Sequence, residues 1–165
     1  MRTSLHVMRI VLLTTLLSGL VFPGHAEAQP VERLTLSEAL DLIEATRDAA
    51  SDASLRLSIA VVDARGDLIA STRMDGARPT TIDTAIGKAM ASAMRGQPSA
   101  DLAAGANTAF SVALQESTGG RLRYFRGALL IVRGGYIVGA VGSSGASAQQ
   151  DEDAVRAGLA AVGLD

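Results

Sequence analysis

The stretch YIVGAVGSSG, residues 136–145, decides the fold of this chain, together with the acidic run Asp151-Glu152-Asp153 that follows it. It predicts a buried strand, a glycine turn and a helix. Apolar or very small residues occupy both faces of the strand, which indicates that both faces are covered. Its glycines allow another backbone or a flat ligand to come close. Ser144 or Ser147 is suited to cap the helix, and the three acidic side chains fall near its first turn, where they compensate exposed backbone N–H groups. This region is the best candidate for a binding site in the sequence.

The first 28 residues have the pattern of a secretory signal peptide. Arg2 and Arg9 precede an apolar run of about 13 residues, and Ala26-Glu27-Ala28 matches a cleavage site with small residues. The run is too short for a membrane anchor, which needs about 20 apolar residues. We therefore expect residues 1–28 to be removed and residues 29–165 to form one domain that is exported to a periplasm or out of the cell.

Composition excludes several kinds of chemistry. The chain has no cysteine, and both histidines, His6 and His25, lie in the expected signal peptide. The remaining domain then lacks imidazole and thiolate, which excludes zinc sites built on them, cysteine nucleophiles and the Ser-His-Asp triad. The net charge of −2 does not favour binding to nucleic acid or anionic lipid.

The rest of the pattern predicts an α+β domain with an antiparallel sheet and flanking helices. Thr35-Leu36-Ser37-Glu38 is a capping box that starts an amphipathic helix ending near residue 53. Two strand-like runs around the sequence Ala64-Arg65-Gly66-Asp67 predict a hairpin. A helix rich in small residues follows and ends at Gly96. The expected strands are residues 57–63, 68–74, 122–125, 127–132 and 136–143. The expected helices are residues 35–53, residues 81–94, a short one from residue 99 and a last one that begins after Ser144 or Ser147. Residues 105–116 are ambiguous between helix and loop.

Four segments of the chain follow one another in a recognisable order. They are the strand that ends in Val62-Asp63, the segment Ser71-Thr72-Arg73-Met74-Asp75-Gly76-Ala77, the helix with Ala85, Lys88 and Ala89, and the ending from Val138 to Gly145 with Asp151-Glu152 and Ala157-Gly158. Together these segments resemble the GlcG/HbpS family of haem-binding-protein-like domains. The resemblance covers nearly all of residues 29–165. It implies a profilin-like fold with a five-stranded antiparallel sheet, a homo-oligomer, and haem or a related tetrapyrrole as the ligand, in haem uptake or redox sensing.

The chain departs from this family in one segment. Arg126-Gly127-Ala128-Leu129-Leu130 stands where members usually have Gly-Gly-x-Pro. A ligand pocket shaped by that loop would differ here. The lack of histidine in the expected domain also removes the commonest axial ligand of haem iron.

Six residues are candidates for contacts to the ligand. Lys88 is the only lysine of the chain, and it is either part of a structural ion pair, for example with Asp75, or a contact to a carboxylate such as a haem propionate. Arg73 and Asp75 follow a strand and could converge on the same place, or they form an exposed pair that contributes about 0–1 kcal/mol. The full set of candidates is Arg73, Asp75, Lys88, Tyr124, Gly142 and Ser144.

The candidates for a ligand to haem iron are few. Tyr124, Tyr136 and Met74 carry phenol or thioether groups of the kind that hold haem iron, although each is also an ordinary core residue. Met90 and Met94 lie four residues apart on one helical face, a spacing typical of core filling.

These observations favour an exported small-molecule binding protein whose ligand is a tetrapyrrole, and they point away from an enzyme. Two alternatives stay open. One is an accessory or enzyme-like protein that acts on a small hydroxy acid, linked to glycolate, or on haem, with Lys88, Arg73 and Asp75 as its polar centre. The other is a purely structural oligomer in which the glycines and alanine-rich helices serve subunit packing.

Overall fold

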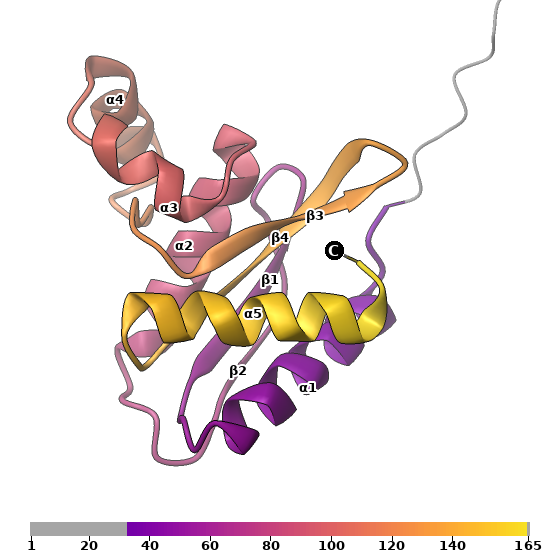
Figure 1. Ribbon diagram of the computed structural model, residues 1–165. Helices are drawn as coiled ribbons and strands as arrows, with labels where there is room; N and C mark the ends of the chain where they lie inside the picture. The colour runs from indigo at the N-terminus through magenta and orange to yellow at the C-terminus, as the bar shows by residue number, and fades with distance from the viewer. Residues whose placement is uncertain (1–32, 165) are drawn as a thin grey trace, which may run out of the picture.

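A four-stranded antiparallel sheet with helices on both faces organises residues 33–164, the part of the chain that the computed structural model describes (Figure 1). The strand order is β2-β1-β4-β3. The expected signal peptide, residues 1–28, lies outside the described residues. The elements are α1 (Leu36–Asp52), β1 (Ser58–Asp63), β2 (Leu68–Arg73), α2 (Thr81–Arg95), α3 (Ser99–Leu102), η1 (Ala103–Gly105), α4 (Ala109–Ser117), β3 (Ala128–Arg133), β4 (Tyr136–Ser144) and α5 (Ala148–Val162).

The first helix and the hairpin after it are confirmed. The Thr35 hydroxyl accepts a hydrogen bond from the Glu38 backbone N–H at 3.2 Å, and the Glu38 carboxylate accepts one from the Thr35 N–H at 2.8 Å. This is the reciprocal capping box that the sequence predicts. β1 and β2 then pair in antiparallel register, with Ser58 opposite Arg73.

β4 lies in the middle of the sheet and pairs with both β1 and β3. α2 covers one face, while α1 and α5 lie side by side on the other (Figure 1). The prediction that both faces of this strand are covered is therefore confirmed. A Cβ atom at Gly142 would lie 2.6 Å from the carbonyl oxygen of Ala85, so this glycine lets the backbone of α2 pack directly on the strand.

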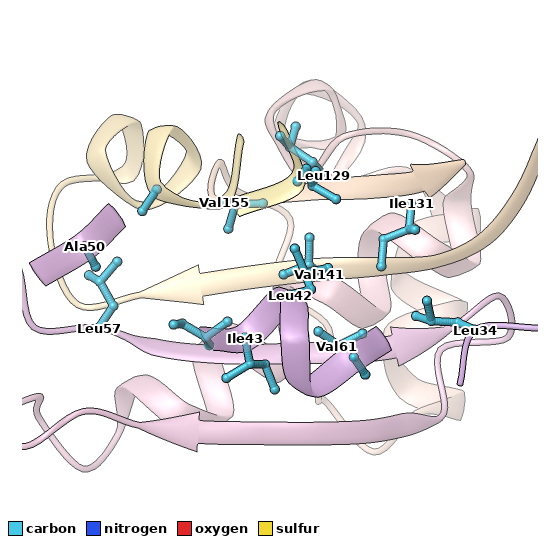
Figure 2. Close-up of a cluster of buried hydrophobic side chains, with 14 of the residues drawn as sticks. Leu34, Leu42, Ile43, Ala50, Leu57, Val61, Leu129, Ile131, Val141 and Val155 are labelled. Atoms are coloured by element: carbon cyan, nitrogen blue, oxygen red, sulfur yellow. The ribbon is translucent and has the colours of Figure 1, made fainter. Parts of the chain in front are cut away.

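Two clusters of buried side chains hold these layers together. The larger one fills the space between the sheet and the α1–α5 pair, and Figure 2 shows Leu42, Val61, Val141 and Val155 pointing into it. The smaller one lies between the sheet and α2 and includes Leu122. Burial of these side chains is the main favourable contribution to the stability of the domain.

The expectation of five strands is wrong for the described residues, which contain four. Residues 122–125, the expected extra strand, do not join the sheet. Their backbone groups have other partners: the Arg123 N–H donates to the Gly87 carbonyl at 3.0 Å, and the Gln115 side chain donates to the Leu122 carbonyl at 3.2 Å. The buried Leu122 fixes this segment against α2 rather than at the edge of the sheet.

Candidate functional site

Lys88 is buried in an ion pair. Its side chain is 1% exposed, and its Nζ atom lies 2.8 Å from Oδ2 of Asp151 and donates to the Ser143 carbonyl at 2.9 Å. Of the two alternatives for this lysine, the structure contains the ion pair, with Asp151 as the partner in place of Asp75. The ammonium group also lies 5.2 Å from the centre of the Phe125 ring, at a distance where a cation and a ring attract each other.

Gly127 makes room for this lysine. The residue has φ +126°, a conformation that favours glycine, and a Cβ atom there would lie 2.5 Å from Lys88 Nζ. Lys88 comes from α2 and Asp151 from α5, which lie on opposite faces of the sheet (Figure 1). The lysine therefore connects the two helical layers beside the start of β3, in the segment where the sequence departs from the family pattern.

The acidic run at the start of α5 divides into buried and exposed residues. Ser147 is the N-cap, as one of the two predicted alternatives, and Asp151 accepts the Ala146 N–H as well as the lysine proton. Glu152 is 3% exposed, and its Oε1 accepts hydrogen bonds from Arg126 at 2.8 Å and Arg156 at 3.0 Å. Compensation of the helix N-terminus was the predicted role of this run; the structure adds ion pairs to its first two residues, Asp151 and Glu152.

The other predicted contact residues do not form one pocket. Tyr124 is half-buried, and its hydroxyl donates to the Ser111 carbonyl at 3.1 Å. Tyr136, at the beginning of β4, is 61% exposed. Ser144 is buried at the end of the same strand, opposite Ser58, and Gly142 is covered by α2. A role for these residues in ligand binding stays a prediction.

Arg73, Met74 and Asp75 do lie together. They line a shallow groove of about 400 Å³ at the end of β2, which does not include Lys88. The polar centre suggested for an enzyme-like protein is thus divided between two places. We call the groove at the end of β2 the arginine groove; its lining residues are Arg47, Ser51, Arg56, Arg73, Met74 and Asp75.

A second groove, of about 430 Å³, lies between the β1–β2 turn, α2 and residues 119–123, and the sequence did not predict it. We call it the α2 groove. Apolar side chains and two arginines share its wall, with two carboxylates from the hairpin and α2. Its lining residues are Gly66, Asp67, Leu68, Asp83, Ile86, Met90, Gly119, Gly120, Arg121 and Arg123.

Gly87 allows the segment with Arg121 and Arg123, which forms one wall of the α2 groove, to pack against α2. A Cβ atom at this position would collide with the Arg121 carbonyl oxygen and lie 2.7 Å from Cγ of Arg123. The segment that carries both arginines therefore packs directly on α2. The Arg123 guanidinium is fixed there by hydrogen bonds to the carbonyls of Gly120 and Leu122, both at 2.8 Å. The half-exposed Leu68 lies on the opposite wall. It could not have revealed this groove from the sequence, because exposed leucines are common and one becomes informative only when it is seen beside a groove.

A third cavity of about 370 Å³ lies where the described chain begins. Leu34, Ile69, Ile137 and Val138 give it an apolar wall, and Arg33 and Arg65 lie among its other lining residues. No methionine or tyrosine lines it. It therefore resembles the α2 groove in polarity and lacks a side chain of the kind that holds haem iron.

The donors available for a metal are limited. Residues 33–164 contain no histidine or cysteine, and within this range no three or more carboxylates gather into a set that could hold a metal ion. Methionine and tyrosine remain as possible ligands to haem iron, and Met90 is the one of them in the wall of the α2 groove. In the same part of the chain, no helix has both the length and the apolar character that crossing a bilayer requires.

Comparison with known proteins gives a consistent result. The family described as haem degrading protein HbpS-like matches residues 34–160. An uncharacterized 15.0 kDa protein from the dhaT-dhaS intergenic region of Citrobacter freundii is 28% identical over 126 residues, which cover 76% of this chain and 89% of that protein.

Solved structures with the same fold include an HbpS variant and a complex of PduOC with heme. A double mutant of HbpS from Streptomyces reticuli superimposes with a TM-score of 0.69 at 28% identity, covering 86% of this chain and 94% of the other. A complex of PduOC with heme superimposes with a TM-score of 0.73 at 24% identity, covering 81% of this chain and 98% of the other. At that identity, the second likeness shows the fold alone.

Proposed function

Because the chain belongs to the HbpS-like family, we propose that it binds haem, and that the α2 groove is the place where it does so. The observation that carries the proposal is the composition of this groove. Apolar side chains, two arginines and a methionine line one space, and they suit the macrocycle, the propionates and the iron of haem, respectively. The heme complex of PduOC, a protein with this fold, supports the choice of ligand.

The α2 groove has the size of a small-molecule site and a mixed polarity. Its volume of about 430 Å³ falls within the range of roughly 300–1,000 Å³ that is usual for small-molecule sites. Leu68 and Ile86 offer apolar surface to the flat macrocycle, whose burial provides most of the binding energy. Arg121 and Arg123 offer guanidinium groups to the two propionates, because the planar fork of donors matches a carboxylate.

Positively and negatively charged side chains lie on different sides of the α2 groove. The two arginines stand on residues 119–123, whereas Asp67 stands on the β1–β2 turn and Asp83 on α2. Arg65 pairs with Asp67 at 3.0 Å, so the charge in the wall that repels a propionate comes mainly from Asp83 on α2, whereas propionates near residues 119–123 would meet opposite charges. The charges therefore favour one orientation of the ligand, with its carboxylates toward Arg121 and Arg123.

Met90 would hold the iron. Met90 is 4% exposed and lines the groove, and a methionine thioether is one of the groups that ligate haem iron. A bound haem would supply an iron centre that can change its oxidation state. The residues of this chain would bind its macrocycle, orient its carboxylates and limit the access of water.

The test is a titration of haemin into the purified protein, followed by the Soret absorption band. We expect a saturable change in the wild type. The double variant Arg121→Gln/Arg123→Gln should bind at least about tenfold more weakly, because each charge-assisted hydrogen bond contributes about 1.5–3 kcal/mol. Arg78→Gln is the matched control, since Arg78 is exposed and does not line the groove. A titration that does not saturate would refute haem binding, and unchanged affinity in the double variant would refute this groove.

Substitutions of the candidate iron ligands complete this test. Met90→Leu preserves volume and should shift the Soret maximum as well as lower the affinity. Tyr124→Phe, Tyr136→Phe and Met74→Leu should leave the spectrum unchanged. A shift that appears only in one of those three would move the iron ligand to that residue.

We also propose that the protein is exported by means of residues 1–28 and assembles as a homo-oligomer. The support for export is the signal-peptide pattern of the sequence, and the support for assembly is the resemblance to the GlcG/HbpS family. Intact mass of the exported product should correspond to a chain that begins at Gln29. Sedimentation should give a mass that is a multiple of that value.

A further inference from the structure

We propose that the arginine groove is a second binding site, for a small oxyanion such as a carboxylate or phosphate compound, and that it acts independently of haem. The groove lies at the opposite end of the β1–β2 hairpin from the α2 groove. The α2 groove includes the turn residues Gly66, Asp67 and Leu68, whereas the arginine groove includes Arg56, before β1, and Arg73, the last residue of β2. Strands of six residues separate these ends by roughly 20 Å.

Two arginines of this groove have hydrogen-bonding capacity to offer. Arg56 donates one hydrogen bond to the Leu55 carbonyl at 2.8 Å, and Arg73 donates one to the Ala77 carbonyl at 2.6 Å. Within residues 33–164, neither has a carboxylate oxygen within 4.0 Å. Since a guanidinium has five N–H donors, each side chain is oriented by one bond and keeps donors for a ligand. A carboxylate or phosphate is the group that such a fork binds in pairs of bonds.

The charges around the groove define the ligand further. Arg47 is already neutralised, because Asp48 and Glu44 hold its guanidinium at 3.0 and 2.9 Å, and these carboxylates raise the pKa of Arg47. The positive charge left for a ligand thus comes from Arg56 and Arg73. Asp75 is the carboxylate in the wall and repels a second anionic group placed against it. The ligand is therefore a compact compound with one oxyanion group.

The loop that presents these residues is fixed before any ligand arrives. The Met74 N–H donates to the Leu57 carbonyl, and the Ala77 N–H donates to the Met74 carbonyl, both at 3.0 Å. The Leu57 N–H lies 3.4 Å from the Met74 sulfur, and Ala77 is 5% exposed. Because the loop is tied to the start of β1, binding does not require it to be ordered first, and less affinity is lost to ordering.

The experiment is a calorimetric titration of the purified protein with inorganic phosphate and, separately, with acetate at low ionic strength. Saturable binding of either anion supports the site, and the tighter of the two identifies its chemical class. Arg56→Gln and Arg73→Gln should each weaken binding at least about fivefold, because each removes charge-assisted hydrogen bonds. Asp75→Asn should tighten binding by removing the repelling charge.

Arg78→Gln is the control that separates a built site from diffuse attraction. It removes the same charge from an exposed position one residue after the fixed loop, outside the groove. Equal weakening by Arg78→Gln and Arg73→Gln would refute the proposal, as would the lack of saturation in the wild type. Haemin binding by Arg73→Gln should equal that of the wild type, so a failure of haem binding and a failure of this site are distinguishable.

Discussion

The Nζ atom of Lys88 and Oδ2 of Asp151 lie 2.8 Å apart, with side chains that are 1% and 3% exposed. They join α2 to α5, which cover opposite faces of the sheet. A buried ion pair of this kind is costly to form, because both charges leave water, and more costly to break, because one partner then stays buried without compensation. Of the two roles that the sequence left open for this lysine, the structure thus contains the structural ion pair.

Replacing this lysine alone should destabilise the domain strongly. We expect Lys88→Met to lower the free energy of unfolding by about 3–5 kcal/mol, because it leaves Asp151 charged and buried. Urea denaturation of the two proteins measures this. The double variant Lys88→Met/Asp151→Asn removes the stranded charge while keeping an acceptor for the Ala146 N–H. It should recover part of the loss, and a double variant as unstable as the sum of the single ones would contradict this account.

The stability of the domain should depend measurably on pH because of Glu38. Hydrogen bonds from the Thr35 backbone N–H and hydroxyl hold the pKa of Glu38 below its ordinary value of 4.5. A lowered pKa in the folded state adds stability that is fully present above pH 4.5 and is lost as the pH falls through the folded-state pKa. The wild type should therefore exceed Glu38→Gln in stability at pH 6, and the difference should shrink toward pH 3. Urea denaturation at the two pH values tests this; a difference that does not change with pH would show that the charge of Glu38 is unimportant.

Gly87 should be sensitive to the smallest substitution. We expect Gly87→Ala to destabilise the domain by about 1–3 kcal/mol, because the added methyl group displaces the Arg121 backbone from α2. Haemin affinity should fall as well, since the displaced segment carries the two arginines of the α2 groove. Gly105→Ala is the matched control: a Cβ atom there meets nothing within 4 Å. Thermal unfolding and haemin titration of both variants measure the effects, and equal behaviour of the two variants would contradict this role for Gly87.

The local structure of this chain could be predicted from sequence where the signals were themselves local. The Thr35 capping box, the hairpin around Gly66 and the helix end at Gly96 each depend on a few neighbouring residues, and the structure contains all three. The covered faces of β4 followed from the apolar or very small residues on both of its sides. The extra strand at residues 122–125 was wrong because strand-like composition does not reveal which backbone groups, here those of Arg123 and Gly87, meet in space.

The candidate site was harder to predict for the same reason. Lys88, Gly127 and Asp151 meet although they come from three separate segments, and no spacing pattern connects them. The α2 groove likewise combines the β1–β2 turn, one helix and the segment with Arg121 and Arg123. Arg73 and Asp75 were found together because they are neighbours in the sequence. Sequence reasoning thus identified residues one at a time, and the tertiary structure decided which of them share a place.

The pairing of β1 with β4 has a consequence for how the domain is made. These two strands form the middle of the sheet, yet one comes from the early part of the described chain and the other from near its end. Until β4 has been synthesised, the inner edge of β1 has no partner, and Val61 and Val62 have only part of their native surroundings. Contacts between residues so far apart in sequence slow folding, and they lengthen the time during which aggregation-prone intermediates exist. The sheet of the nascent chain therefore cannot be completed until its last strand has been synthesised.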